Sequence, residues 1–88
     1  MMLVAVSGGY DPLHIGHLVQ IENAAKLGDA LLVFLNSDAW LMRKKGYCFL
    51  PFEQRFKILD SIRYITRVIE VDDEDGTVAS AIREHRPD

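Results

Sequence analysis

Hydrophobic residues near the N-terminus form two short continuous runs, Leu3 to Val6 and Ala30 to Leu35. Apolar runs of this length are typical of strands that are buried in a parallel sheet. Between the runs, apolar residues recur mostly three or four positions apart, which predicts an amphipathic helix that starts at Ile15 and that Gly28 stops. The apolar positions of this helix are Ile15, Leu18, Val19, Ile21, Ala24, Ala25 and Leu27.

The middle of the chain contains signals for two further helices. The polar residues Asn36-Ser37-Asp38 suit the start of a short helix that runs through Met42, because such side chains cap helices. A basic loop is expected over Arg43-Lys44-Lys45-Gly46. Pro51 then suits the first turn of another helix. The apolar stripe of that helix is Phe52, Phe56, Ile58, Leu59 and Ile62.

The C-terminal third completes an alternation of strands and helices. A third strand is expected around Thr66 to Val71, and a last helix from its cap Thr77 to about Arg86. Strands that alternate with helices require crossover connections, so the fold class is α/β, a doubly wound, Rossmann-like parallel sheet flanked by helices. Without a repeat or linker, residues 1–88 form a single domain. Its outer strands would have unpaired edges, so we expect this domain to be partial, truncated after the third strand and its helix.

Composition narrows the possible surroundings and partners of the chain. A membrane-spanning helix needs about 20 apolar residues, and no apolar run in the sequence approaches that length. The single cysteine, Cys48, cannot form an internal disulfide, which suits a reducing compartment and predicts a cytoplasmic protein. The net charge of −3 offers no broad surface for nucleic acid or for an anionic membrane. Any phosphate binding must therefore be local.

The turn after the first strand is the expected place for a phosphate. In open α/β sheets, ligands bind at the carboxyl ends of strands, and here that turn runs from Ser7 to His14. Gly8 and Gly9 would let the backbone approach a ligand closely, and the helix that follows presents unpaired N–H groups to an anion.

His14 and His17 lie three positions apart in the first turn of the predicted helix, so both imidazoles can project from one face. Placed there, they can donate hydrogen bonds to phosphate oxygens that gain charge during a transfer reaction. Gly16 between them keeps the helix surface open. Histidines at this spacing are more often solvated or core residues, but the strand, the glycines and Asp11-Pro12 together favour the catalytic interpretation.

The segment Gly8-Gly9-Tyr10-Asp11-Pro12-Leu13-His14-Ile15-Gly16-His17 resembles the cytidylyltransferase-like family of nucleotidyltransferases. Further matches are Ala25-Lys26-Leu27-Gly28-Asp29, Asn36-Ser37-Asp38, Lys45-Gly46, Pro51, Glu53-Gln54-Arg55 and Ile62-Arg63-Tyr64-Ile65. The resemblance implies transfer of CMP or AMP from CTP or ATP to a phosphorylated small molecule, with Mg²⁺ and release of pyrophosphate. The acceptor's phosphate oxygen would attack the α-phosphate directly.

The resemblance also implies roles for individual residues. His14, His17 and Lys45 would be catalytic, the histidines steadying the triphosphate and Lys45 neutralising charge across the α-phosphate and the acceptor phosphate. Asp11 would organise the turn through its side chain or, as a second choice, help to hold the metal. The residues expected to bind the nucleotide are Gly8, Gly9, Tyr10, Asp11, Gly16, Lys44 and Arg55. For Arg55, a salt bridge on the helix surface is an equally weighted alternative.

Three alternatives stay open at this point. The chain could be a truncated module that binds a nucleotide without turnover, or a structural fragment that associates through its sheet edge. The acidic run Asp72 to Asp75 could suggest a metal site, but we interpret it as a solvated turn. A homodimer is possible through the element Arg63 to Thr66, although Thr66 replaces the aspartate that the family has there.

Overall fold

The computed structural model describes residues 2–74 and 79–88. Its elements in chain order are β1 (Leu3–Gly8), α1 (Ile15–Ala25), β2 (Ala30–Leu35), α2 (Asp38–Lys45), α3 (Phe52–Asp60), β3 (Arg67–Glu70) and α4 (Ala79–His85). The predicted alternation of strands and helices is confirmed. Thr77, predicted to cap the last helix, lies outside the described residues.

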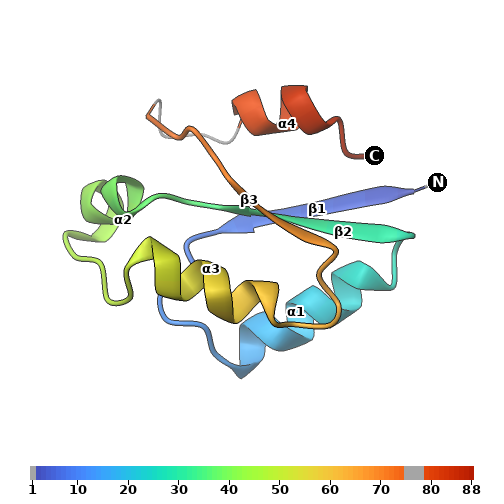
Figure 1. The fold of residues 1–88 in the computed structure, drawn as a ribbon, viewed down its shortest axis with the longest axis horizontal. Coiled ribbons are helices and arrows are strands. Elements are labelled where there is room, and N and C mark those ends of the chain that lie inside the picture. The colour runs from blue at the N-terminus through green and yellow to red at the C-terminus, as the bar shows by residue number, and fades with distance from the viewer. Residues whose placement is uncertain (1, 75–78) are drawn as a thin grey trace.

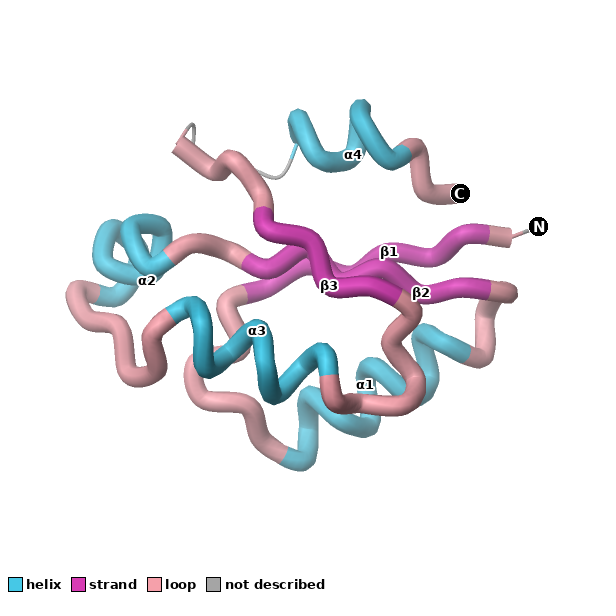
Figure 2. Tube along the Cα trace, in the orientation of Figure 1, coloured by secondary structure: helices cyan, strands magenta, loops and turns pink. Residues whose placement is uncertain are grey.

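The three strands form one parallel sheet in the order β1-β2-β3. Leu3 pairs with Ala30 and Gly8 with Leu35, so β1 and β2 end side by side. Figure 1 shows α1 and α3 on one face of the sheet and α4 on the other, with α2 beyond the ends of the strands. In Figure 2, loops gather beside α2 at these carboxyl ends. The predicted Rossmann-like α/β sheet is therefore confirmed.

Strand β2 is apolar throughout because both of its faces are buried. Leu31, Val33 and Leu35 pack with Ile21 of α1 and Leu59 of α3. The intervening side chains join a second cluster on the opposite face, made of Leu32, Phe34, Ile69 and Val71. The central strand thus carries both halves of the core, which explains the continuous apolar run in the sequence.

Helix α1 begins at Ile15 as predicted, but it differs from the prediction in which residues are buried and in where it ends. Ile15 and Val19 are exposed, and Ile21 and Ala24 are its buried residues, because only its C-terminal half packs on the core. The helix ends at Ala25 rather than next to Gly28. A Cβ at Gly28 would lie 2.7 Å from Val4 Cγ2, so this glycine permits close packing against the start of β1 instead of stopping the helix.

Helix α2 is longer than the sequence predicted. It continues past Met42 to Lys45, so the basic residues form its last turn and not a loop. Gly46 ends it with a left-handed φ of 81°, and its N–H donates to the carbonyl of Met42 at 3.0 Å. Cations in the last turn are favourable beside the negative end of a helix. The basic side chains therefore project from the last turn of a helix and not from a loop.

The C-terminal residues return to the start of the sheet. The N–H of Asp88 donates to the carbonyl of Leu3 at 2.7 Å, on the side of β1 that faces away from β2. Within residues 2–74 and 79–88, no helix has the length and apolar character that crossing a membrane requires.

Candidate active site

An open hollow of about 470 Å³ lies where β1 ends and α1 begins. It is walled by the predicted site residues Gly9, Tyr10, Asp11, His14, His17, Lys44 and Lys45, together with Pro12, Trp40 and Leu41. The β1–α1 turn supplies one side of the hollow and α2 the other. The fold thus brings together both histidines and both lysines that were predicted to act on phosphate. Gly8, Gly16 and Arg55 are outside this wall.

His14 and His17 are fastened to the first turn of α1. His14 is the N-cap, and its Nδ1 accepts the N–H of Gly16 at 3.0 Å. Nδ1 of His17 in turn accepts the N–H of His14 at 3.1 Å. The two ring centroids are 4.0 Å apart. A Cβ at Gly16 would lie 2.8 Å from Cε1 of His14, so glycine makes room for that ring.

This arrangement fixes which nitrogen of each ring donates. A neutral imidazole whose Nδ1 accepts a hydrogen bond carries its proton on Nε2. Burial lowers the pKa of His17, and the neighbouring His14 lowers it further, so the neutral ring is favoured. The pair therefore suits hydrogen-bond donation from two Nε2–H groups, rather than proton exchange or nucleophilic attack.

The Tyr10 side chain belongs to the core. It is 6% exposed, and its ring meets that of His17 edge-on, with the centroids 5.1 Å apart. Burial raises the pKa of Tyr10 to about 12, so the phenol stays neutral. Its φ of 50° lies in the left-handed region, which turns the backbone sharply between β1 and α1.

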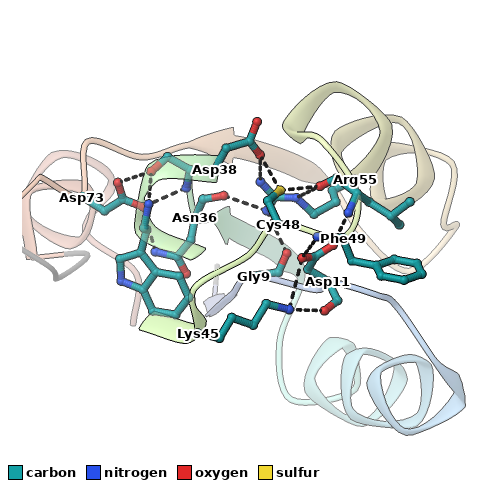
Figure 3. Close-up of polar contacts among 12 residues, drawn as sticks. Gly9, Asp11, Asn36, Asp38, Lys45, Cys48, Phe49, Arg55 and Asp73 are labelled. Carbon is teal, nitrogen blue, oxygen red and sulfur yellow. Dashed lines mark hydrogen bonds and ion pairs between the residues drawn. The ribbon is translucent and has the colours of Figure 1, made fainter. Parts of the chain in front are cut away.

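Asp11 joins this turn to the segment that follows α2. Its fully buried side chain accepts the N–H groups of Phe49 at 2.6 Å and Leu50 at 2.5 Å (Figure 3). Lys45 Nζ lies 3.1 Å from Asp11 Oδ2 and donates to the Asp11 carbonyl at 2.5 Å. Burial acts to raise the pKa of Asp11, but these hydrogen bonds and the ammonium outweigh it and lower the pKa.

These contacts favour the first role that was expected of Asp11, organising the turn. Its two oxygens already face backbone N–H groups and an ammonium, an environment that does not fit a metal ligand. Among the residues that the structure describes, His, Cys, Asp and Glu form no group of three or more that could hold a metal ion.

The two glycines of the turn permit close packing within the chain. A Cβ at Gly9 would lie 2.6 Å from Leu41 Cδ2, and one at Gly8 would lie 3.2 Å from Cε2 of Tyr10. The ring of Tyr10 therefore takes the space beside Gly8, whereas Gly9 contacts Leu41 and also lines the hollow. Gly9 lets α2 approach the turn and so brings the lysines near the histidines.

Arg55 is buried, so the expected alternative is wrong about the helix surface, although the salt bridge itself is present, with Asp38. The side chain is 1% exposed, and Nη2 lies 2.6 Å from Asp38 Oδ1. Nη1 donates to the carbonyls of Gly9 and Asn36, both at 2.8 Å, and Nε donates to that of Leu50 at 2.9 Å (Figure 3). Arg55 thus holds together the segments that follow β1, β2 and α2, from behind the hollow.

Asp73 is a structural residue that the sequence interpretation missed. The acidic run was expected to be solvated, which is correct for Asp72 and Glu74, whereas Asp73 is 3% exposed. Asp75 lies outside the described residues. One signal in the sequence could have indicated its burial. Asp73 follows the third predicted strand and Asn36-Ser37 follows the second, and parallel strands place such segments at the same edge of the sheet.

The model of the family described as cytidylyltransferase-like matches residues 5–88. The chain belongs to this cytidylyltransferase-like family. The match includes the β1–α1 turn, α2 and Arg55, and so contains every residue of the hollow.

Curated relatives include three kinds of protein. The chain is 38% identical over 69 residues to the glycerol-3-phosphate cytidylyltransferase of Bacillus subtilis, covering 78% of this chain and 54% of that protein. It is 39% identical over 88 residues to the FAD synthase of Methanospirillum hungatei, covering 100% and 54%. It is 39% identical over 74 residues to the bifunctional protein HldE of Citrobacter koseri, covering 82% and 16%. The chain therefore spans about half of the first two and a small part of the third.

A solved structure has the same fold. The lipopolysaccharide core biosynthesis protein from Thermoplasma volcanium superposes with a TM-score of 0.91 at 25% sequence identity. The match covers 100% of this chain and 70% of that protein.

Proposed function

We propose that this chain forms the phosphate-binding part of a nucleotidyltransferase. In that reaction, CMP or AMP moves from CTP or ATP to a phosphorylated small molecule, and pyrophosphate is released. The observation that carries the proposal is the pairing of His14 and His17, both held through Nδ1, with Lys44 and Lys45 across one hollow. Two imidazoles and two lysine side chains line this hollow, and such groups suit a polyphosphate.

The proposed step is an in-line displacement at the α-phosphorus. A phosphate oxygen of the acceptor forms a bond to that phosphorus, while the bond to the bridging oxygen of the pyrophosphate breaks. Negative charge builds on the phosphate oxygens, and Nε2–H groups of His14 and His17 stabilise it by donation. Lys44 and Lys45 supply positive charge from the end of α2. No side chain needs to act as a nucleophile.

Magnesium enters this proposal with the triphosphate. Mg²⁺ is commonly held by substrate phosphates and water with few protein ligands, and the donors around the hollow do not form a site of their own. The relatives named as a cytidylyltransferase and as an FAD synthase leave both CTP and ATP as substrates to test. A polyol, sugar or alcohol phosphate is the proposed acceptor, in the cytoplasm.

The decisive experiment is a transfer assay. The chain is incubated with Mg²⁺, CTP or ATP labelled at the α-phosphate, and a panel of polyol and sugar phosphates. We expect label in the acceptor and an equal amount of pyrophosphate, both abolished by His17→Ala. Absence of transfer with every acceptor would reject the proposal for this chain.

A second candidate is a module that binds a nucleotide without turnover. The observation that favours it is the small share of its relatives' length that this chain spans. The chain spans 54% or less of the curated relatives described above. Calorimetry that shows triphosphate binding, without pyrophosphate release in the same samples, would select this candidate. Sedimentation of these samples also tests the homodimer, which would double the 10.0 kDa mass.

A further inference from the structure

Asp73 binds the start of α2 through a buried carboxylate. Oδ2 accepts the side-chain N–H of Asn36 at 3.1 Å and the N–H of Ser37 at 2.8 Å. Oδ1 accepts the Ser37 hydroxyl at 2.7 Å. The same hydroxyl oxygen caps the helix by accepting the N–H of Trp40 at 3.0 Å. Asp73 therefore orients the residue that begins α2.

A second contact holds α2 further along its length. Nη2 of Arg43 donates to the backbone carbonyl of Asp73 at 2.8 Å. Ser37 and Arg43 are separated by about 9 Å along a helix axis, at the usual rise per residue. Two attachments at this spacing restrict both the position of α2 and its direction.

The opposite side of α2 faces the proposed phosphate site. Leu41, Lys44 and Lys45 line the hollow, while Asp73 does not. A hydrogen-bonded route also leads from Asp73 to the turn, because Asn36 accepts Nη1 of Arg55, which also donates to Gly9. Figure 3 shows this succession from Asp73 through Asn36 to Gly9.

We propose that Asp73 is a positioning residue for nucleotidyl transfer: by clamping α2, it sets where Lys44 and Lys45 meet the phosphates, without touching them. This inference rests on the proposed function above. Asp73→Asn retains the shape of the side chain but offers one acceptor oxygen where three donors converge. The amide nitrogen of the variant cannot accept from the Ser37 hydroxyl, and the remaining hydrogen bonds lose the charge that strengthens them, so the attachment of α2 is weakened.

The kinetic test compares Asp73→Asn with Glu74→Gln, the same change of charge at an adjacent exposed residue. We expect kcat to fall about 10-fold to 100-fold in Asp73→Asn, the range that a displacement near 1 Å can cause, and to stay unchanged in Glu74→Gln. In a Lys44→Ala/Lys45→Ala background, Asp73→Asn should cost less than about twofold, since its effect passes largely through those two lysines. Equal losses in both backgrounds, or no loss in either, would overturn the inference.

A measurement without turnover separates this inference from the proposed function. In ¹⁵N–¹H spectra of the whole chain, Asp73→Asn should shift the amides of Lys44, Lys45 and Gly46, and Glu74→Gln should not. Unshifted amides overturn the positioning role even if transfer is observed. Shifted amides in a chain without transfer support the clamp and reject the reaction.

Arg43→Ala covers the case in which Asp73→Asn does not fold. Arg43 is exposed, so its loss leaves the core intact while removing the second attachment of α2. We expect a smaller loss of kcat than in Asp73→Asn, since the contacts of Asp73 with Asn36 and Ser37 remain. A folded Arg43→Ala variant with unchanged kcat would count against the clamp.

Discussion

Nζ of Lys45 lies 3.1 Å from Oδ2 of Asp11, so one ion pair joins the end of α2 to the turn that precedes α1. The Asp11 carboxylate also accepts two backbone N–H groups from the segment after α2. A single buried side chain therefore links the two walls of the hollow.

Replacing Asp11 with Asn should destabilise the fold. A hydrogen bond to a charged group contributes about 1.5 to 3 kcal/mol, and we expect a loss of about 2 kcal/mol in the free energy of unfolding. The pKa of Asp11 is lowered in the folded state, so its contribution is complete at neutral pH and is lost as pH falls below about 4. Urea unfolding should show a difference between the free energies of unfolding of the two proteins at pH 7, and a smaller difference at pH 3. A constant difference would contradict this assignment.

Gly9→Ala should be costly because of its neighbour in α2. The added Cβ would lie 2.6 Å from Cδ2 of Leu41, and overpacking of this kind costs about 1 to 3 kcal/mol. Leu41→Ala alone creates a cavity, but in the double variant the two changes relieve each other. Thermal unfolding of all four proteins should therefore give a double variant more stable than the sum of the single losses predicts. Strict additivity would mean that the two residues do not meet.

Arg55→Lys should behave as a severe substitution. The ammonium cannot reproduce the planar set of donors that reaches three carbonyls and Asp38. Loss of a buried ionic partner costs about 3 to 5 kcal/mol. We expect the free energy of unfolding, measured in urea, to decrease by an amount at the lower end of this range. Lys57→Arg, at an exposed position of the same helix, is the matched control and should leave stability unchanged. A stable Arg55→Lys protein would refute the bracing role.

His17 should be a neutral donor at pH 7. Long-range ¹⁵N–¹H spectra should show the tautomer protonated at Nε2 and a titration midpoint below the ordinary value of about 6.5. His14→Gln should raise the midpoint partway, because burial is the larger cause of the lowered pKa and the neighbouring imidazole the smaller. A midpoint above the ordinary value would remove the basis for donation by a neutral ring.

The sequence predicts the order of elements well, because burial on both faces imposes a continuous apolar run on β2. It also locates the histidines, whose spacing is local to one helical turn. The end of α2 was missed because Arg43-Lys44-Lys45 suits a solvated loop and a last helical turn equally well. In the structure Gly46 decides between them.

Long-range partners could not be predicted in this way. Arg55 is buried because the carbonyls of Gly9, Asn36 and Leu50 converge on it, and no local pattern around Arg55 records this convergence. Asp73 likewise gains its partners from the parallel register, which places the ends of β2 and β3 next to each other. A charged residue in isolation predicts solvent exposure.

His14 and His17 fasten the first turn of α1 as well as facing the hollow. Selection for the proposed reaction and selection for a formed helix would therefore act on the same two side chains. In a lineage that lost the reaction, loss of either histidine would still weaken the helix, so this motif can persist after the chemistry has gone. The persistence of Lys44, an exposed residue near the end of α2, would be the more informative sign of an active descendant.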